Sequence, residues 1–329
     1  LTKIIRQLEM KRGTCMLNRN GLLATVAILA GMTYQALADD FRVAAVLPGV
    51  VTDKSFNQQV FEGLKASEKL GGVEIAYTEK VTQAEQVEVM SDYARRGYNL
   101  IVGAGGEYVD AAKRIRSQFP DVSVVVLNGA ETENVTTLMF EHEQFAYLVG
   151  LVAGRVSKNG TLAALTAQPI PAFDRVVKGF TTGLHVSHPE GEVLTTLAND
   201  WSDVAKAKAA SVNLISQGAD VLLPYLDGAY LGVVQAADEK GVYVVGVAQD
   251  LAVDDPKANL FSTIQDYGGM VSWSVEKAKA GELEAKRYDF GVGSFPNEMG
   301  PFNDVVPQNV RDEVKAAVED LKAGKVTFK

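Results

Sequence analysis

Cysteine and histidine are scarce in this 329-residue chain, which contains one cysteine and three histidines. Zinc sites are built from these residue types at close spacing, and no H-x-x-x-H or H-E-x-x-H spacing occurs. The single Cys15 has no partner within the chain for a disulfide. Chains of this length bury enough apolar surface to fold without one. We therefore expect neither a metal site nor a disulfide.

Motifs of the common enzyme classes are also missing. The sequence has no G-x-S-x-G nucleophile elbow and no G-x-x-x-x-G-K-[S/T] phosphate loop. Gly103-Ala104-Gly105 follows a predicted strand, but Tyr108 occupies the third glycine position of the nicotinamide-binding fingerprint. We predict that the chain is not an enzyme, has no catalytic residues and uses no cofactor.

Basic residues are outnumbered by acidic ones, with 32 Lys and Arg against 41 Asp and Glu and a net charge of −9. The first 38 residues hold five basic residues and one acidic residue, so the remainder is more acidic still. Phosphate backbones and anionic lipid surfaces repel such a chain. We therefore predict no nucleic-acid partner and no binding to membrane surfaces.

The N-terminal residues are typical of a secretory signal peptide. A short apolar run at residues 21–32 follows the basic residues Lys11, Arg12 and Arg19, and Ala36-Leu37-Ala38 forms an A-x-A cleavage site. The run is shorter than the roughly 20 residues that span a bilayer. Cys15 precedes it and is therefore misplaced for lipidation. We predict a signal peptide over residues 1–38, cleaved after Ala38, and a periplasmic protein that is not a lipoprotein.

Predicted strands and helices alternate along the rest of the chain. Short apolar runs typical of strands buried in parallel sheets occur in two series. They fall at residues 43–47, 73–78, 100–103, 122–127 and 137–140, then at 162–166, 192–196, 221–224, 243–247 and 260–264, with one more at 288–292. This pattern predicts an α/β fold with two Rossmann-like, doubly wound lobes and a ligand cleft between them.

The first strand and its turn set the pattern for the site. Pro48 and Gly49 end the strand, and Ser55 with Gln58 has the S-x-x-Q spacing of a capping box, which predicts a helix from there to about Leu70. Phe56 and Asn57 then occupy the first turn of a helix that follows a strand's carboxyl end, where open α/β sheets bind ligands. The alternative is that Phe56 packs on the core and Asn57 is solvated.

Further aromatic and polar residues follow the other predicted strands. The candidate ligand-binding residues are Phe56, Asn57, Gly105, Asn128, Gln168, Trp201, Tyr225, Asp227 and Asp250. Asn128-Gly129 and Asp227-Gly228 are also ordinary turn formers, and Tyr225 fits a core position equally well. Taken together, flat aromatic rings beside amide and carboxylate groups favour a planar ligand that forms hydrogen bonds.

Several blocks resemble the basic membrane protein (BMP) family of ABC-transporter substrate-binding proteins. They are residues 53–58 (D-K-S-F-N-Q), 101–105, 143 with 146–150 (A-Y-L-V-G), 179–180, 217–221 and 232–236. The resemblance implies a type I periplasmic binding fold with two lobes and three crossovers. It also implies a purine nucleoside ligand stacked between aromatic rings, and a membrane permease as partner. We expect a monomer that closes by hinge motion near residues 140–143, 250–255 and 292–297.

The chain departs from this family where the ribose would bind. Leu47, Asn128, Ala248 and Asp266 stand at positions where the resemblance implies three carboxylates and a lysine. Ribose hydroxyls without partners cost about 1–3 kcal/mol each. The sequence thus favours a free purine base such as adenine. The alternatives are a nucleoside or another heterocycle, a ligand-sensing receptor module of the same fold, and a nucleoside hydrolase if Asp53, Asp250 and Asp266 converge.

The predicted lobe boundaries follow the two series. Lobe 1 comprises residues 39–141 and 255–292, and lobe 2 comprises residues 142–254 and 293–329.

Overall fold

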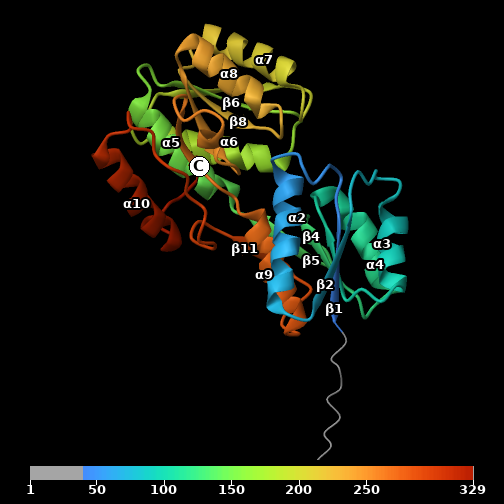
Figure 1. Cartoon of the computed structure of the whole chain (residues 1–329). Coiled ribbons are helices and arrows are strands. Elements are labelled where there is room, and N and C mark those ends of the chain that lie inside the picture. Colours follow the sequence, from blue (N-terminus) through green and yellow to red (C-terminus); the bar gives the residue numbers. More distant parts are fainter. Residues whose placement is uncertain (1–39, 329) are drawn as a thin grey trace, which may run out of the picture. The chain divides into compact units, whose positions relative to one another are not determined.

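Two parallel sheets form the framework of the chain in the computed structural model, which describes residues 40–328 (Figure 1). The predicted signal peptide and its cleavage site therefore lie outside the described residues. Among residues 40–328, no helix has the length and apolar character needed to cross a membrane. The predicted α/β fold with two doubly wound lobes is confirmed.

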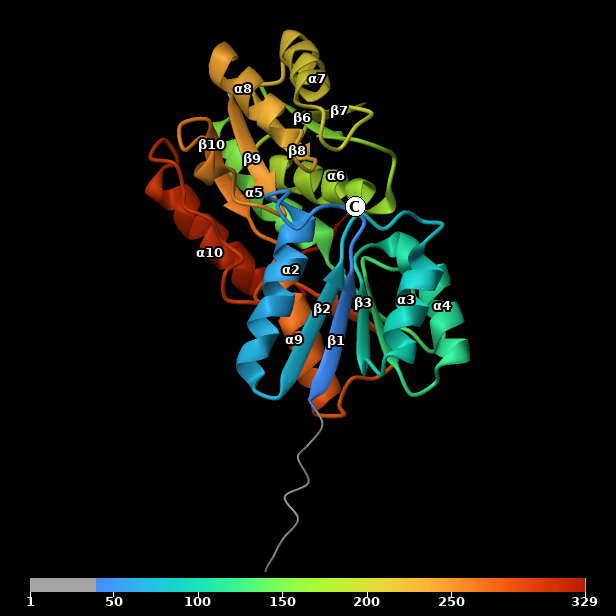
Figure 2. The same ribbon diagram turned by 45° about the vertical axis from the view of Figure 1, so that its right-hand side comes forward.

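The first sheet contains six parallel strands in the order β11-β5-β4-β3-β1-β2. They are β1 (Phe41–Val46), β2 (Val73–Thr78), β3 (Leu100–Gly103), β4 (Ser123–Leu127), β5 (Thr136–Phe140) and β11 (Arg287–Phe290). Helices α2 (Phe56–Ala66) and α9 (Tyr267–Lys279) cover one face, and α3 (Gln86–Arg95) and α4 (Val109–Gln118) cover the other (Figure 2). We call this unit lobe 1.

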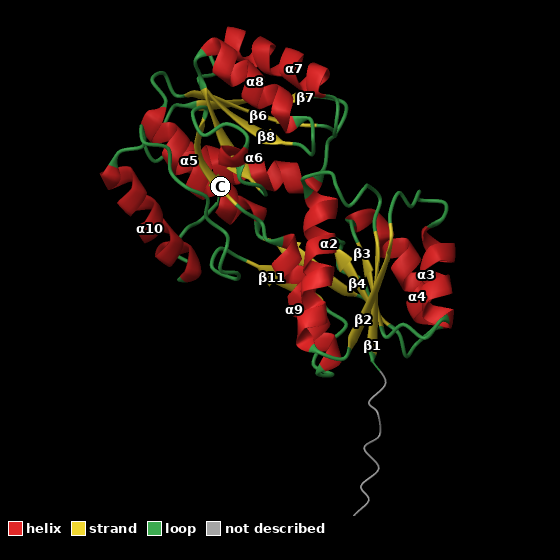
Figure 3. Cartoon of the chain, in the orientation of Figure 1, coloured by secondary structure: helices red, strands yellow, loops and turns green. Residues whose placement is uncertain are grey.

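The second sheet contains five parallel strands in the order β10-β9-β8-β6-β7. They are β6 (Thr161–Thr166), β7 (Glu192–Leu197), β8 (Val221–Tyr225), β9 (Tyr243–Val247) and β10 (Asn259–Thr263). Helices pack on both faces (Figure 3): α5 (His142–Val156) with α6 (Pro171–Leu184), and α7 (Val204–Ser216) with α8 (Tyr230–Lys240). The final helix, α10 (Gln308–Lys322), packs on α5. We call this unit lobe 2.

The strand order places a crevice in each sheet. In both sheets the first strand of the series lies between the second and the third, so chain connections leave in opposite directions on either side of it. Loops after those strands diverge there, which opens a ligand crevice at the carboxyl edge of the sheet. The crevices lie between β1 and β3 in lobe 1 and between β6 and β8 in lobe 2.

One predicted lobe boundary is wrong. Residues 255–292 were assigned to lobe 1, but β10 pairs with β9 in the sheet of lobe 2. The boundary predicted between residues 254 and 255 falls in a loop between the 3-10 helix η4 (Leu251–Val253) and β10. The second crossing between lobes therefore lies at residues 264–266, after β10, and not at 250–255.

The start of α2 was predicted at the correct residue but with the wrong cap. The Ser55–Gln58 capping box does not form. The Asp53 carboxylate instead accepts hydrogen bonds from the backbone N–H groups of Ser55, Asn57 and Gln58 at 2.8, 3.1 and 3.0 Å. This arrangement satisfies donors that a helix N-terminus leaves free, and it releases the Ser55 hydroxyl for a contact elsewhere. The 3-10 helix η2 (Ser67–Leu70) extends α2 to the predicted end.

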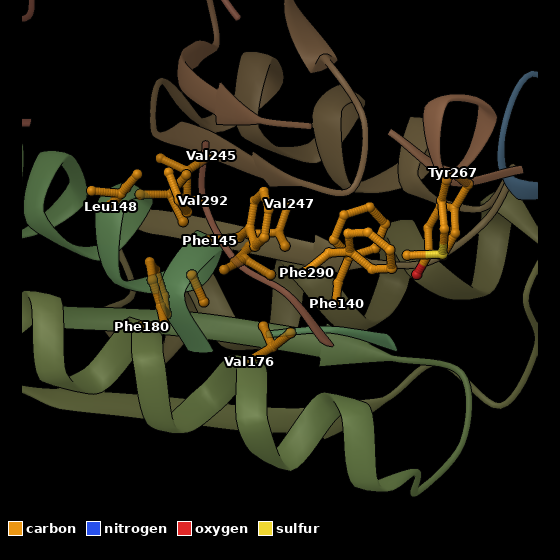
Figure 4. Close-up of a cluster of buried hydrophobic side chains, with 14 of the residues drawn as sticks. Phe140, Phe145, Leu148, Val176, Phe180, Val245, Val247, Tyr267, Phe290 and Val292 are labelled. Atoms are coloured by element: carbon orange, nitrogen blue, oxygen red, sulfur yellow. The ribbon is translucent and has the colours of Figure 1, made fainter. Parts of the chain in front are cut away.

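Aromatic side chains pack the three crossings together (Figure 4). Phe140 ends β5 at the first crossing, and its ring centroid lies 5.1 Å from that of Tyr267, which begins α9 after the second. Phe145 and Phe290 lie 5.4 and 6.2 Å from Phe140. We call these four residues the hinge cluster. Because three of its members are fully buried or nearly so, the crossings share one apolar core beneath the facing sheet edges.

Candidate ligand-binding site

A cavity of about 780 Å³ lies where the carboxyl edges of the two sheets face each other. Its walls come from the loops after β1, β3 and β4 in lobe 1, and from those after β7, β8 and β9 in lobe 2. The start of α6, Tyr267 of α9, His142 of α5, Met139 of β5 and Arg287 of β11 also line it. Sites for small organic ligands occupy about 300–1,000 Å³, so the cavity has the size of a ligand site.

The structure brings seven of the nine predicted residues to this cavity. Those that line it are Phe56, Asn57, Gly105, Asn128, Trp201, Tyr225 and Asp227. Gln168 and Asp250 are not among the lining residues. Gln168 is exposed in the turn after β6, and the Asp250 carboxylate caps η4 by accepting from the Ala252 N–H at 3.0 Å. A residue that follows a strand thus lies at the edge of the sheet, but its side chain does not always reach the cavity.

Phe56 contributes an aromatic wall on the lobe 1 side. Its ring is partly buried, lines the cavity and packs perpendicular to Tyr267, with centroids 4.8 Å apart. Perpendicular packing of this kind holds both rings in place and adds to the stabilisation from burial. Trp201 and Tyr225 line the same cavity from lobe 2. Flat apolar walls therefore come from both lobes.

Asn57 is buried and has both ends of its amide engaged. Its Oδ1 accepts from the Gly49 N–H at 3.1 Å, and its Nδ2 donates to the Asp53 carboxylate at 2.7 Å. A Cβ atom on Gly49 would lie 2.5 Å from that Nδ2, so any larger residue there would displace the Asn57 amide. Asn57 therefore holds the loop between β1 and α2 in shape, and through it positions Phe56.

Asp227 places a carboxylate in the lobe 2 wall. Its Oδ1 accepts from the Ser55 hydroxyl of lobe 1 at 3.3 Å, a contact that joins the two lobes directly. Burial, reinforced by the nearby negative charge of Asp53, raises the pKa of Asp227 to about 6, and the Ser55 hydrogen bond opposes this shift. At neutral pH the cavity thus contains an ionised acceptor that is poorly solvated.

Several residues of the cavity were missed by the sequence analysis. Tyr267, His142, Gln59 and Arg175 all line it. The Tyr267 hydroxyl accepts from Asn128 Nδ2 at 3.0 Å and donates to Gln265 Oε1 at 3.3 Å. His142 and Tyr267 begin helices directly after the first and second crossings, so the rule that selected Phe56 would also have found them. Arg175 carried no such signal, and its Nε donates to Glu143 at 2.6 Å.

The acidic residues required by the hydrolase alternative do not converge. Asp53 caps α2, Asp250 caps η4, and the Asp266 carboxylate caps α9 by accepting from the Gly269 N–H at 2.7 Å. Within residues 40–328, no group of three or more His, Cys, Asp or Glu is placed to hold a metal ion. The structure therefore gives no support to a hydrolytic metal site in the described part of the chain.

Gln59 joins the lobes across the cavity. Its Nε2 donates to the Ala248 carbonyl of lobe 2 at 3.3 Å, and its Oε1 accepts from the Tyr267 N–H at the second crossing, also at 3.3 Å. Ala248 has a positive φ of 82°, which is strained for a residue with a Cβ and presents its carbonyl to α2. Gln59 thus stabilises the arrangement of the lobes seen in this structure.

We expect Gln59→Met to weaken ligand binding about threefold to tenfold, because net hydrogen bonds of about 0.5–1.5 kcal/mol are lost from the arrangement of the lobes that forms the cavity. Gln58→Met is the matched control, since within residues 40–328 the neighbouring Gln58 amide bonds to Lys54 and Glu62 of the same segment and to no residue of lobe 2. Calorimetric affinities and the radius of gyration without ligand provide the measurements. An unchanged affinity and radius in Gln59→Met would show that Gln59 does not stabilise closure.

Two lobes of parallel α/β structure, with a ligand-sized cavity at their facing sheet edges, define a bilobal solute-binding protein. A family model described as ABC transporter substrate-binding protein, PnrA-like (Bmp), matches residues 41–318. The chain belongs to this family, as its sequence blocks predicted. It is a substrate-binding protein of an ABC transporter, a class that works outside the cytoplasmic membrane with a membrane permease and is not a class of enzymes.

Known proteins are similar over most of the chain. The transcriptional activator protein med of Bacillus subtilis is 27% identical over 283 residues, covering 84% of this chain and 87% of that protein. A purine-binding protein of Brucella abortus is 26% identical over 256 residues, covering 76% and 70%. A solute-binding protein of an Aeropyrum pernix ABC transporter system has the same fold, with a TM-score of 0.75, 17% identity and coverage of 88% and 93%.

Proposed function

We propose that the chain binds a purine-type ligand in the cavity between its lobes and delivers it to the permease of an ABC importer. The observation that carries this proposal is that Phe56 from lobe 1 and Trp201 from lobe 2 line the same cavity. A base held between aromatic side chains gains about 1–3 kcal/mol per stacking contact. The purine-binding relative supports the same ligand class.

Polar groups around the aromatic walls match the edge of a purine. Asn128 offers an amide that donates and accepts, with its orientation fixed by the Tyr267 hydroxyl. Asp227 offers a carboxylate that accepts from ring or exocyclic N–H groups. A planar heterocycle that carries both donors and acceptors on its rim pairs with both residues.

A free base such as adenine is favoured over a nucleoside. The family resemblance implies ribose contacts at several positions. At two of these positions the side chain is buried or already forms another hydrogen bond. Leu47 is fully buried in the core, and the Asp266 carboxylate is engaged as the α9 cap. Ala248 has no hydrogen-bonding side chain. Ribose hydroxyls left without partners would cost about 1–3 kcal/mol each, so a nucleoside binds about tenfold or more weakly than its base.

Two measurements test the ligand. Native mass spectrometry of freshly purified protein should reveal a co-purified purine. Titration calorimetry with adenine, guanine, hypoxanthine, adenosine, guanosine and free ribose should rank a base above its nucleoside. A nucleoside that binds more tightly than its base would overturn the preference for the base. Binding of none of these compounds would overturn the purine assignment.

The proposal includes the state of the mature protein. The protein is exported with a signal peptide that is cleaved after Ala38, and it is a monomer without a lipid anchor. It closes on its ligand at the three crossings between the lobes. These crossings are residues 141, 264–266 and 291–307. Scattering that shows no compaction at saturating ligand would contradict closure.

A ligand-sensing module of the same fold is the second candidate, because one relative is named a transcriptional activator. Deletion of the gene in its host separates the two roles. Loss of purine uptake would support transport, and unchanged uptake with altered gene expression would support sensing.

A further inference from the structure

Glu107 places a second carboxylate in the cavity wall, beside that of Asp227, and no sequence motif indicated it. It follows β3 within the 3-10 helix η3 (Gly106–Tyr108), lines the cavity from lobe 1 and keeps an exposed surface. Its carboxylate lies directly over Gly105, another lining residue, where a Cβ atom would collide with it. Gly105 thus leaves the space that the carboxylate fills. The carboxylate therefore lies on the cavity wall with part of its surface open to a ligand.

In the described part of the chain, no cation offsets either carboxylate of the cavity. Partial burial raises the pKa of Glu107, and no basic residue among residues 40–328 acts on it in the opposite direction. The same holds for Asp227, whose pKa is raised by burial and by the charge of Asp53. Both carboxyl groups are ionised at neutral pH. Lobe 1 and lobe 2 therefore each present a negative charge that is only partly solvated.

The basic residues of the cavity wall do not balance these charges. Arg175 Nε donates to Glu143 at 2.6 Å, and Arg287 donates to Asp289 through Nε and Nη2 at 2.9 and 2.6 Å. Neither Glu143 nor Asp289 is among the lining residues, so each arginine is already paired with a carboxylate outside the lining. The ring of His142 is neutral, because burial lowers its pKa to about 3. The described wall therefore keeps a net negative charge.

We propose that Glu107 is a specificity-determining residue that, together with Asp227, selects purines with amino groups and excludes anionic purines. The assignment rests on the proposed purine ligand and refines it. An ionised carboxylate only accepts hydrogen bonds, so it pairs with exocyclic amino groups and ring N–H groups. An anionic purine would bring a like charge into a partly buried site, where repulsion is stronger than in water. Adenine fits such a wall, whereas urate, an anion at neutral pH, does not.

Titration calorimetry with adenine and urate at neutral pH tests this selection. In the unchanged protein, urate should bind about thirtyfold or more weakly than adenine, as repulsion between unit charges in a partly buried site predicts. Glu107→Gln keeps the shape of the side chain and removes one charge, so it should narrow this ratio to about fivefold. Asp110→Asn is the matched control, because Asp110 is exposed in the first turn of α4 and is not among the lining residues. It should leave the ratio unchanged.

A second variant changes the charge of the wall without replacing a lining residue. Glu143→Gln removes the ion-pair partner of Arg175, so the affinity for urate should rise about threefold to tenfold relative to that for adenine. Urate that binds the unchanged protein as tightly as adenine would overturn the selection, whatever the variants do. An unchanged ratio in Glu107→Gln would remove Glu107 from it. In both cases tight binding of adenine would leave the proposed function standing, whereas binding of no purine would overturn both proposals.

Discussion

Phe56→Ala should weaken purine binding about tenfold to a hundredfold while the protein remains folded, because a base loses one stacking face worth about 1–3 kcal/mol. Phe56 is partly buried and lines the cavity, and its ring packs edge to face with Tyr267 at 4.8 Å. Removal of the ring thus also releases Tyr267, which positions Asn128 through its hydroxyl. Both changes should weaken ligand binding.

Phe61→Ala is the matched control for this variant. Phe61 lies on the same helix, is also partly buried, and packs against Tyr77 with centroids 4.7 Å apart, outside the cavity lining. The two variants remove the same ring from the same helix, so they should lower the melting temperature similarly and differ only in affinity. Titration calorimetry on both variants measures the difference in affinity. If Phe56→Ala binds every purine as tightly as the parent protein does, the stacking arrangement is wrong.

Sequence periodicity was sufficient for the fold because parallel strands buried on both faces appear as short apolar runs. The strand at residues 100–103 is an example, since all four residues are buried. Periodicity could not assign β10 to a sheet, because a buried strand has the same apolar run in either sheet. Its pairing with β9 is what places it in the sheet of lobe 2. The lobe boundary predicted between residues 254 and 255 therefore fell one strand too early, before β10 instead of after it.

Strand ends predicted only part of the candidate site. Phe56 and Asp227 follow β1 and β8, which border the crevices, and they reach the cavity, whereas Gln168 follows β6, which also borders a crevice, and does not. Asp250 follows β9 as well, but its carboxylate finds nearer donors in η4. The contacts that connect the lobes, such as Ser55 with Asp227, join residues 172 positions apart and leave no local signature in the sequence.

Asp227→Asn should affect stability and binding in opposite directions. The pKa of Asp227 in the folded protein is about 6, against 3.8 for a solvated carboxyl group, and burial is the main cause. Between these values the folded state holds a proton that the unfolded state has released, so the stability of the parent protein falls as pH rises through this range. The cost of ionisation is then fully present above about pH 6.

Asparagine has no charge to bury, so the variant escapes this cost. At pH 7 it should be more stable than the parent protein by up to about 3 kcal/mol, since one pKa unit corresponds to 1.36 kcal/mol. The difference should shrink as pH falls from about 6 and vanish near pH 4. Unfolding measured at several pH values provides the test. Asp238→Asn, an equal charge change at an exposed site in lobe 2, should show no such pH dependence.

Ligand affinity should fall in the same variant that gains stability. A carboxylate accepts N–H groups of the ligand in hydrogen bonds worth about 1.5–3 kcal/mol, so Asp227→Asn should weaken purine binding by about tenfold to over a hundredfold at pH 7. In the parent protein affinity should fall below about pH 6, as the carboxyl group takes up its proton, whereas the variant should show a flat profile. A functional site that is kept at the expense of stability has this signature. If Asp227→Asn is more stable but binds purines as tightly as the parent protein, the carboxylate does not contact the ligand.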